Sequence, residues 1–137
     1  METQEALKVE KLYTEVVEDK LILAGQEPIK IWLRPLKYPV ENARSQMAHK
    51  ETYDLMIESG SGEDDANQGG YCAFRLQALF YSIRKNEKAD SPRLFENVRQ
   101  AGAMSAQEQE RLLSVYQDAF FMTEEDLGNS LRVKTNS

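Results

Sequence analysis

The sequence predicts a mainly α-helical fold with a small β-hairpin, an α+β class in which about five helices pack around a central helix at residues 71–87. Three observations predict this class. Apolar side chains recur at steps of three and four in residues 71–87, which is the spacing of one face of a helix. Residues 21–33 contain two β-rich runs on either side of a turn with Gly25. The remaining patterns are helical, and several begin at a residue that caps helices.

The size and composition of the chain are those of one soluble domain. It has 137 residues, of which 41% are hydrophobic and 29% are charged, and at this length roughly two thirds of the unfolded surface can be buried. We expect a single globular domain at residues 1–128 with a flexible acidic loop at residues 59–70, followed by a frayed tail at residues 129–137. No run reaches the ~18 apolar residues of a membrane span, and the N-terminus lacks a signal-peptide pattern. We therefore expect a cytoplasmic protein without membrane contact.

The N-terminal third predicts a helix followed by the hairpin. Residues 3–17 carry apolar side chains at helical spacing, which favours a helix, although residues 13–17 also suit a strand because Tyr, Thr and Val are strand formers. The hairpin strands are expected at residues 21–23 and 29–33. Alternation in the second strand places three apolar residues on one face and three other residues on the opposite face: Ile29, Ile31 and Leu33, and Lys30, Trp32 and Arg34.

The middle of the chain predicts a helix, a loop and the central helix. Pro39 suits the first turn of a helix at residues 40–59, whose expected buried residues are Val40, Ala43, Met47, Leu55 and Met56. Residues 59–70 hold no large apolar side chain, which indicates the acidic loop. The central helix should bury one face, made of Cys72, Leu76, Leu79, Phe80 and Ile83.

The C-terminal third predicts two further helices and a brief final turn. Ser91 followed by Pro92 is typical of a helix start, here of a short helix that ends near Gly102. Residues 105–108 form a capping box for a last long helix, in which the Ser105 hydroxyl accepts from a free N–H and Glu108 reaches back. A second capping signal at residues 123–126 predicts the final turn.

Candidate catalytic or metal-binding residues do not form a pattern. The single histidine, His49, has no second ligand at zinc-site spacing, and the single cysteine, Cys72, favours a core residue and excludes an internal disulfide bond. The loop at Asp65 resembles a calcium loop only in part, because its twelfth position is Leu76 where a glutamate is required. The net charge of −6 repels phosphate backbones. We therefore expect no enzyme, no cofactor, no metal and no nucleic-acid partner.

Several aromatic and apolar side chains lie off the predicted core faces, and such surface residues typically bind partner proteins. Trp32 is on the polar face of the hairpin, and residues 120–122 are three consecutive large apolar residues that one narrow helix face cannot bury. The alternative is that these side chains wedge against neighbouring helices. The candidate partner-binding residues are Trp32, Phe74, Tyr81, Phe120, Phe121 and Met122.

Three short segments resemble the tail assembly chaperones of long-tailed bacteriophages. They are LRPL at the end of the hairpin (residues 33–36, within IWLRPL), RLF ahead of a short helix (93–95, within DSPRLF), and the serine-capped last long helix, which starts with MSAQE (104–108) and has Leu112, Leu113 and Tyr116 near its end. The resemblance covers roughly residues 20–127. It implies a mostly helical, non-enzymatic protein of the host-cell cytoplasm that binds and shields the helical tape-measure protein during tail assembly.

The resemblance predicts self-association as a homo-oligomer or co-purification with a helical tail protein. Many copies of an acidic domain, each making modest contacts, would coat such a partner by multivalency. The alternative hypothesis is a small acidic inhibitor or adaptor, for example a phage-encoded anti-defence protein, that binds one host protein in a one-to-one complex sensitive to salt.

Overall fold

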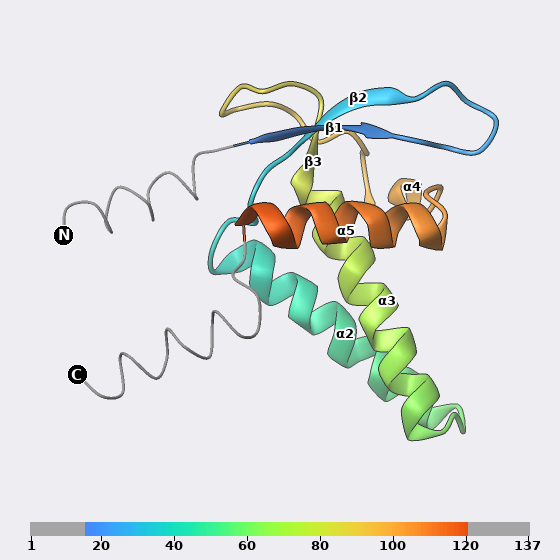
Figure 1. The fold of residues 1–137 in the computed structure, drawn as a ribbon. Coiled ribbons are helices and arrows are strands. Elements are labelled where there is room, and N and C mark those ends of the chain that lie inside the picture. The colour runs from blue at the N-terminus through green and yellow to red at the C-terminus, as the bar shows by residue number, and fades with distance from the viewer. Residues whose placement is uncertain (1–15, 121–137) are drawn as a thin grey trace.

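A computed structural model describes residues 16–120 of the chain. Figure 1 shows a small antiparallel sheet from which two helices, α2 and α3, run away side by side, while α5 crosses α3 beneath the sheet. Helices make up more than half of the described residues, so the α+β class is confirmed. The elements in chain order are β1 (Val17–Leu21), β2 (Ile29–Leu33), α2 (Val40–Glu58), α3 (Glu63–Ser82), β3 (Ile83–Arg84), α4 (Val98–Ala101) and α5 (Ala106–Phe120).

The sheet has the strand order β1-β2-β3, and both pairings are antiparallel. The hairpin prediction is confirmed, and β2 has the predicted bounds because its alternating pattern buries Ile31 and Leu33 completely. The first strand is Val17–Leu21 rather than residues 21–23, with Val17 opposite Leu33. Residue 17 therefore lies in a strand. The rest of the helix expected at residues 3–17 falls outside the described residues, except for residue 16.

The acidic loop expected at residues 59–70 is wrong for residues 63–70, which are helical. Glu63, Asp64 and Asp65 form the first turn of α3, where the positive end of the helix dipole stabilises carboxylates. The connection to α2 is only residues 59–62, and Gly60 makes the turn with a φ of +94° that other residues rarely adopt. The helix predicted at residues 71–87 is accordingly α3, residues 63–82.

The end of α3 at Ser82 has a tertiary cause. Ile83 is extended, with φ −77° and ψ 121°, and pairs with Leu33 of β2. Ile83 is fully buried, as are Leu33 and Leu79. The core therefore lies between the sheet, α5 and the C-terminal half of α3, while Cys72 and Leu76 of the predicted apolar face are only half-buried.

The helix predicted at residues 40–59 is present as α2, but its predicted inner face is wrong. Val40, Ala43, Met47 and Leu55 are exposed, and of the five predicted residues only Met56 is half-buried. The residues that α2 buries are Glu41 and Ser45. The reason is the close approach of α3, because a methyl group at Gly70 would lie 2.9 Å from the His49 carbonyl oxygen. Small and polar residues, rather than large apolar ones, fit a helix pair packed this closely.

The C-terminal helices confirm one predicted start and correct another. α4 begins at Val98 with Asn97 as its cap, whose Oδ1 accepts from the Gln100 N–H at 2.9 Å, so no helix starts at Ser91. One of the two contacts of the capping box predicted at the start of α5 is present, since Ser105 Oγ accepts from the Glu108 N–H at 3.1 Å. Residues 16–120 contain four helices; the turn predicted at residues 123–126 lies outside the described range. None of the described helices is long and apolar enough to cross a membrane.

Candidate functional site

The predicted partner-binding residues do not share one surface. Tyr81 is only 3% exposed and belongs to the core. Its hydroxyl accepts from Gln77 Nε2 at 3.0 Å, and the Arg93 guanidinium lies 4.8 Å from its ring centroid. The structure therefore corrects its placement on an exposed second face of the central helix.

The other predicted residues come from separate elements. Trp32 is half-buried on β2, with Lys30 Nζ 5.7 Å from its ring centroid. Phe74 is half-buried in the middle of α3. Phe120 ends α5 and makes an edge-on ring contact with Tyr116 at 5.0 Å, so it packs against the core. Phe121 and Met122 lie outside the described residues.

A concentrated apolar surface occurs instead on α2, where the sequence pattern predicted burial. In the part of the chain that the structure describes, six large apolar side chains are exposed, and one of them is Ile22 of the hairpin. The other five lie within residues 38–57: Tyr38 (63% exposed), Val40 (56%), Met47 (56%), Leu55 (62%) and Ile57 (40%). We call these five residues, with the exposed α2 residues between them, the α2 face. The signal for it in the sequence is the Gly69-Gly70 pair, which lets α2 pack through its polar side.

A buried ionic cluster holds the start of α2 against the rest of the fold. Glu41 Oε2 lies 2.9 Å from an Arg93 guanidinium nitrogen and 4.0 Å from one of Arg84, and its Oε1 accepts from the Lys37 N–H at 2.9 Å. Arg84 also donates to the carbonyl oxygens of Tyr81 and Ser91. The cluster therefore connects α2 to β3 and to the segment after it.

The cluster contains more positive than negative side chains. Burial lowers the pKa of Arg84, Glu41 raises it, and the neighbouring guanidinium groups of Arg93 and Arg34 lower it again. A shallow pocket beside the cluster is lined by Arg34, Pro35, Leu36, Lys37, Tyr38 and Arg84. With one carboxylate among several cations, the base of α2 attracts acidic groups.

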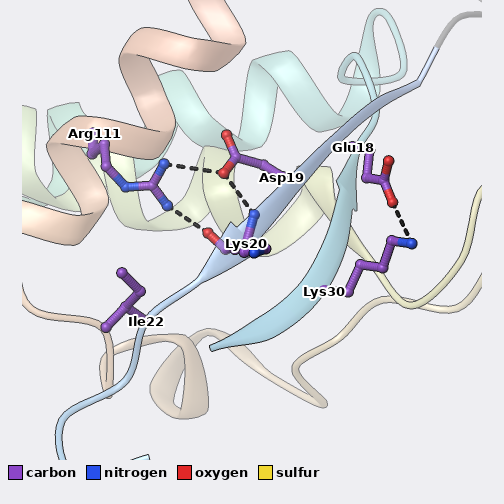
Figure 2. A pocket seen from close by; sticks show the side chains of 6 residues that line it. All are labelled: Glu18, Asp19, Lys20, Ile22, Lys30 and Arg111. Carbon is purple, nitrogen blue, oxygen red and sulfur yellow. Dashed lines mark hydrogen bonds and ion pairs between the residues drawn. The ribbon is translucent and has the colours of Figure 1, made fainter. Parts of the chain in front are cut away.

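A second hollow lies between the hairpin and α5 (Figure 2). Arg111 reaches from α5 to Asp19, at 3.1 Å, and to the carbonyl oxygen of Lys20. Glu108 accepts from the Ile22 N–H at 3.0 Å, in place of the predicted return to its own helix cap. The Lys20 carbonyl belongs to β1, the outer strand of the sheet, and the Ile22 N–H lies directly after the end of that strand. The α5 side chains therefore cover the edge of that strand, which an additional strand could otherwise use.

Four of the charged groups in this hollow form ion pairs: Arg111 with Asp19, and Lys30 with Glu18. Burial would lower the pKa of Arg111, but its hydrogen bonds to Glu108 and Asp19 hold that pKa above its ordinary value. Lys30 is paired with Glu18 at 2.6 Å. Among residues 16–120, no group of three His, Cys, Asp or Glu side chains is arranged to hold a metal ion. The hollow is best explained as the joint between the hairpin and α5.

Comparisons of the chain with protein-family models, with curated proteins and with solved structures found no match. The functional assignment therefore depends on the surfaces described above and on the short sequence segments.

Proposed function

We propose that this chain is a non-enzymatic, protein-binding assembly factor, and that the α2 face is its interaction surface. The observation that carries the proposal is the concentration of five exposed large apolar side chains within residues 38–57. Burying one such side chain against a partner stabilises a complex by roughly 1.5–3 kcal/mol. Single exposed apolar residues are ordinary, but five within about twenty residues, four of them on α2, are typical of a protein interface.

The fold supports this interpretation of α2. The ionic cluster at Glu41 and the tight packing against Gly70 hold the helix in place from its inner side. A helix fixed in this way presents its outer side chains without a further loss of backbone conformational entropy on binding, which favours affinity. The cationic base of α2 adds an attraction for acidic side chains of a partner.

The specific role that we propose is that of a phage tail assembly chaperone, which binds and shields the helical tape-measure protein. Support comes from the LRPL and RLF segments and from the serine-capped last helix with its Leu-Leu pair and Tyr116. An exposed helical face on an acidic domain suits a factor that coats a long amphipathic helix in many copies and later leaves it.

Co-expression with candidate tail proteins tests both the chaperone role and the use of the α2 face as the interaction surface. We expect the tagged chain to capture the tape-measure protein, and a Met47→Glu/Leu55→Glu double variant to lose that capture. Ile22→Glu is the matched control, because Ile22 is an exposed apolar residue outside α2. A wild-type chain that ignores every tail component would exclude the chaperone role. Capture that the double variant retains would exclude the α2 face. A one-to-one complex with a single host protein would support the inhibitor or adaptor hypothesis instead.

A further inference from the structure

One stripe of the α2 face alternates apolar and charged residues. It consists of Val40, Arg44, Met47, Glu51 and Leu55, all exposed and spaced by three or four residues, so that they follow one side of the helix. In the described part of the chain, no side chain pairs with Arg44 or Glu51, whereas the neighbouring Lys50 is paired with Asp54. The two charges in the stripe are therefore free to meet charges of another molecule.

The stripe is complementary to itself when its direction is reversed. Val40 and Leu55 are equally far along the chain from the midpoint between residues 47 and 48, and so are Arg44 and Glu51. A second α2 laid antiparallel about an axis at that midpoint places apolar residues opposite apolar residues, with Met47 near the centre. It also places each Arg44 opposite a Glu51.

We propose that the α2 face binds a second copy of this chain, with the two α2 helices antiparallel about a two-fold axis near residues 47 and 48. The inference rests on the proposed function, since it concerns the same face, which the second copy covers until the copies separate and the face is free for the tape-measure protein. A two-fold interface uses the same patch on both copies, which the symmetry of this stripe provides. In a parallel arrangement Arg44 would face Arg44 and Glu51 would face Glu51, so charge repulsion selects the antiparallel one.

The size of the stripe predicts a weak dimer. Val40 and Leu55 lie about 22 Å apart along a helix that rises about 1.5 Å per residue. One helix pair of that length falls in the range of small interfaces, below about 1,200 Å² in total, which form transient complexes. We therefore expect a dimer whose population depends on protein concentration. Such a weak dimer suits an assembly factor, because its copies must be able to separate.

Charge reversal tests the arrangement. In Arg44→Glu homodimers two carboxylates would face each other at two places, and in Glu51→Arg homodimers two guanidinium groups would do so. We expect each variant to weaken association by about tenfold or more in sedimentation equilibrium, because like charges are brought together. An equimolar mixture of the two variants restores opposite charges at both places and should dimerise, as should the Arg44→Glu/Glu51→Arg double variant.

Lys85→Glu and Glu87→Arg are the matched controls, since both residues are exposed outside α2 and the changes in net charge are the same. Circular dichroism and the melting temperature verify that every variant is folded. A wild-type chain that stays monomeric up to about millimolar concentration, where even a weak complex of about −4 kcal/mol would form, overturns the inference. A dimer that both single variants retain also overturns it, because the contact would then lie elsewhere.

The outcome separates this inference from the proposed function. A monomeric wild-type chain that still captures a tail protein through Met47 and Leu55 would overturn the dimer and leave the interaction face in place. A dimer that follows the charge-reversal pattern, from a chain that captures no tail protein, would support the inference and exclude the chaperone role.

Discussion

The backbone N–H of Leu36 donates to the hydroxyl oxygen of Tyr116 at 2.9 Å, across 80 residues of sequence. Leu36 lies between β2 and α2, and Tyr116 is in the last turns of α5. Both residues are buried. This bond, with the Glu41 cluster next to it, positions the start of α2 relative to the core and therefore determines where the α2 face points.

Tyr116→Phe should destabilise the fold by about 1–3 kcal/mol, because the buried Leu36 N–H loses its acceptor and water cannot replace it. Urea denaturation followed by circular dichroism measures this change. Tyr71→Phe is the control, since the Tyr71 hydroxyl donates to Glu110 at 3.1 Å in an exposed position and its loss should cost less than about 1 kcal/mol. Equal effects of the two variants would contradict the structural importance of the Leu36 contact.

The same tyrosine predicts a loss of stability at alkaline pH. Burial is the main cause that raises the pKa of Tyr116, the Leu36 N–H bond lowers it, and Glu41 and Tyr38 raise it, so that the resulting pKa is about 12. The unfolded chain ionises this group near its ordinary pKa of about 10. The stabilisation is therefore complete below about pH 10 and is lost as the pH rises to about 12. The difference in urea midpoint between wild type and Tyr116→Phe should shrink over this range; a constant difference would contradict the assignment.

Glu41→Gln removes the only carboxylate that pairs with Arg84 and Arg93 among the described residues. We expect a loss of about 3 kcal/mol in the free energy of unfolding, because Arg84 is left nearly buried without a counter-charge. Glu27→Gln, in the exposed hairpin turn, is the control and should change stability by less than about 0.5 kcal/mol. A Glu41→Gln variant as stable as the control would show that the cluster does not hold α2.

The elements that the sequence predicted well are those whose local pattern and tertiary environment agree. In β2 the alternation that favours a strand also points Ile31 and Leu33 into the core. In α5 the Ser105 cap lies directly before a helix whose apolar residues, such as Leu112, face that core. Local and global preferences then give the same answer.

The elements that differed from prediction depend on contacts distant in sequence. Residues 63–70 have the composition of a loop, but the helix buries Ala66 fully and packs Gly70 against His49. β3 has two residues and is held by pairing with β2 on one side and with Arg93 on the other. Tertiary contacts override local propensity in such segments.

The candidate site was missed for the same reason. Apolar residues at helical spacing, such as Val40 and Met47, predict a buried face when nothing indicates what packs on the other side. Only the structure shows that α2 packs against α3 and buries the side of Glu41 and Ser45. The opposite error occurred for Tyr81, which was predicted to be exposed but is buried, because the distant Arg93 packs over its ring.

The glycine pair in α3 provides a test of the packing that turns the apolar side of α2 outward. In Gly70→Ala the new methyl group would meet the His49 carbonyl oxygen at 2.9 Å and its ring at 3.0 Å. Backbone cannot yield as a side chain does, so the helices must separate, and we expect a net loss of about 1–2 kcal/mol. Gly69→Ala is the matched control. Its methyl group would meet the Met56 sulfur atom at 2.2 Å, and this flexible side chain can move aside.

The helix preference of alanine over glycine, about 1 kcal/mol, should then leave Gly69→Ala near neutral or slightly stabilised. Thermal and urea denaturation of the two variants measure the difference. If Gly70→Ala is as stable as Gly69→Ala, then α2 and α3 are not packed closely at His49. The exposure of Val40, Met47 and Leu55 would then lose its structural cause, because α2 could rotate to bury them.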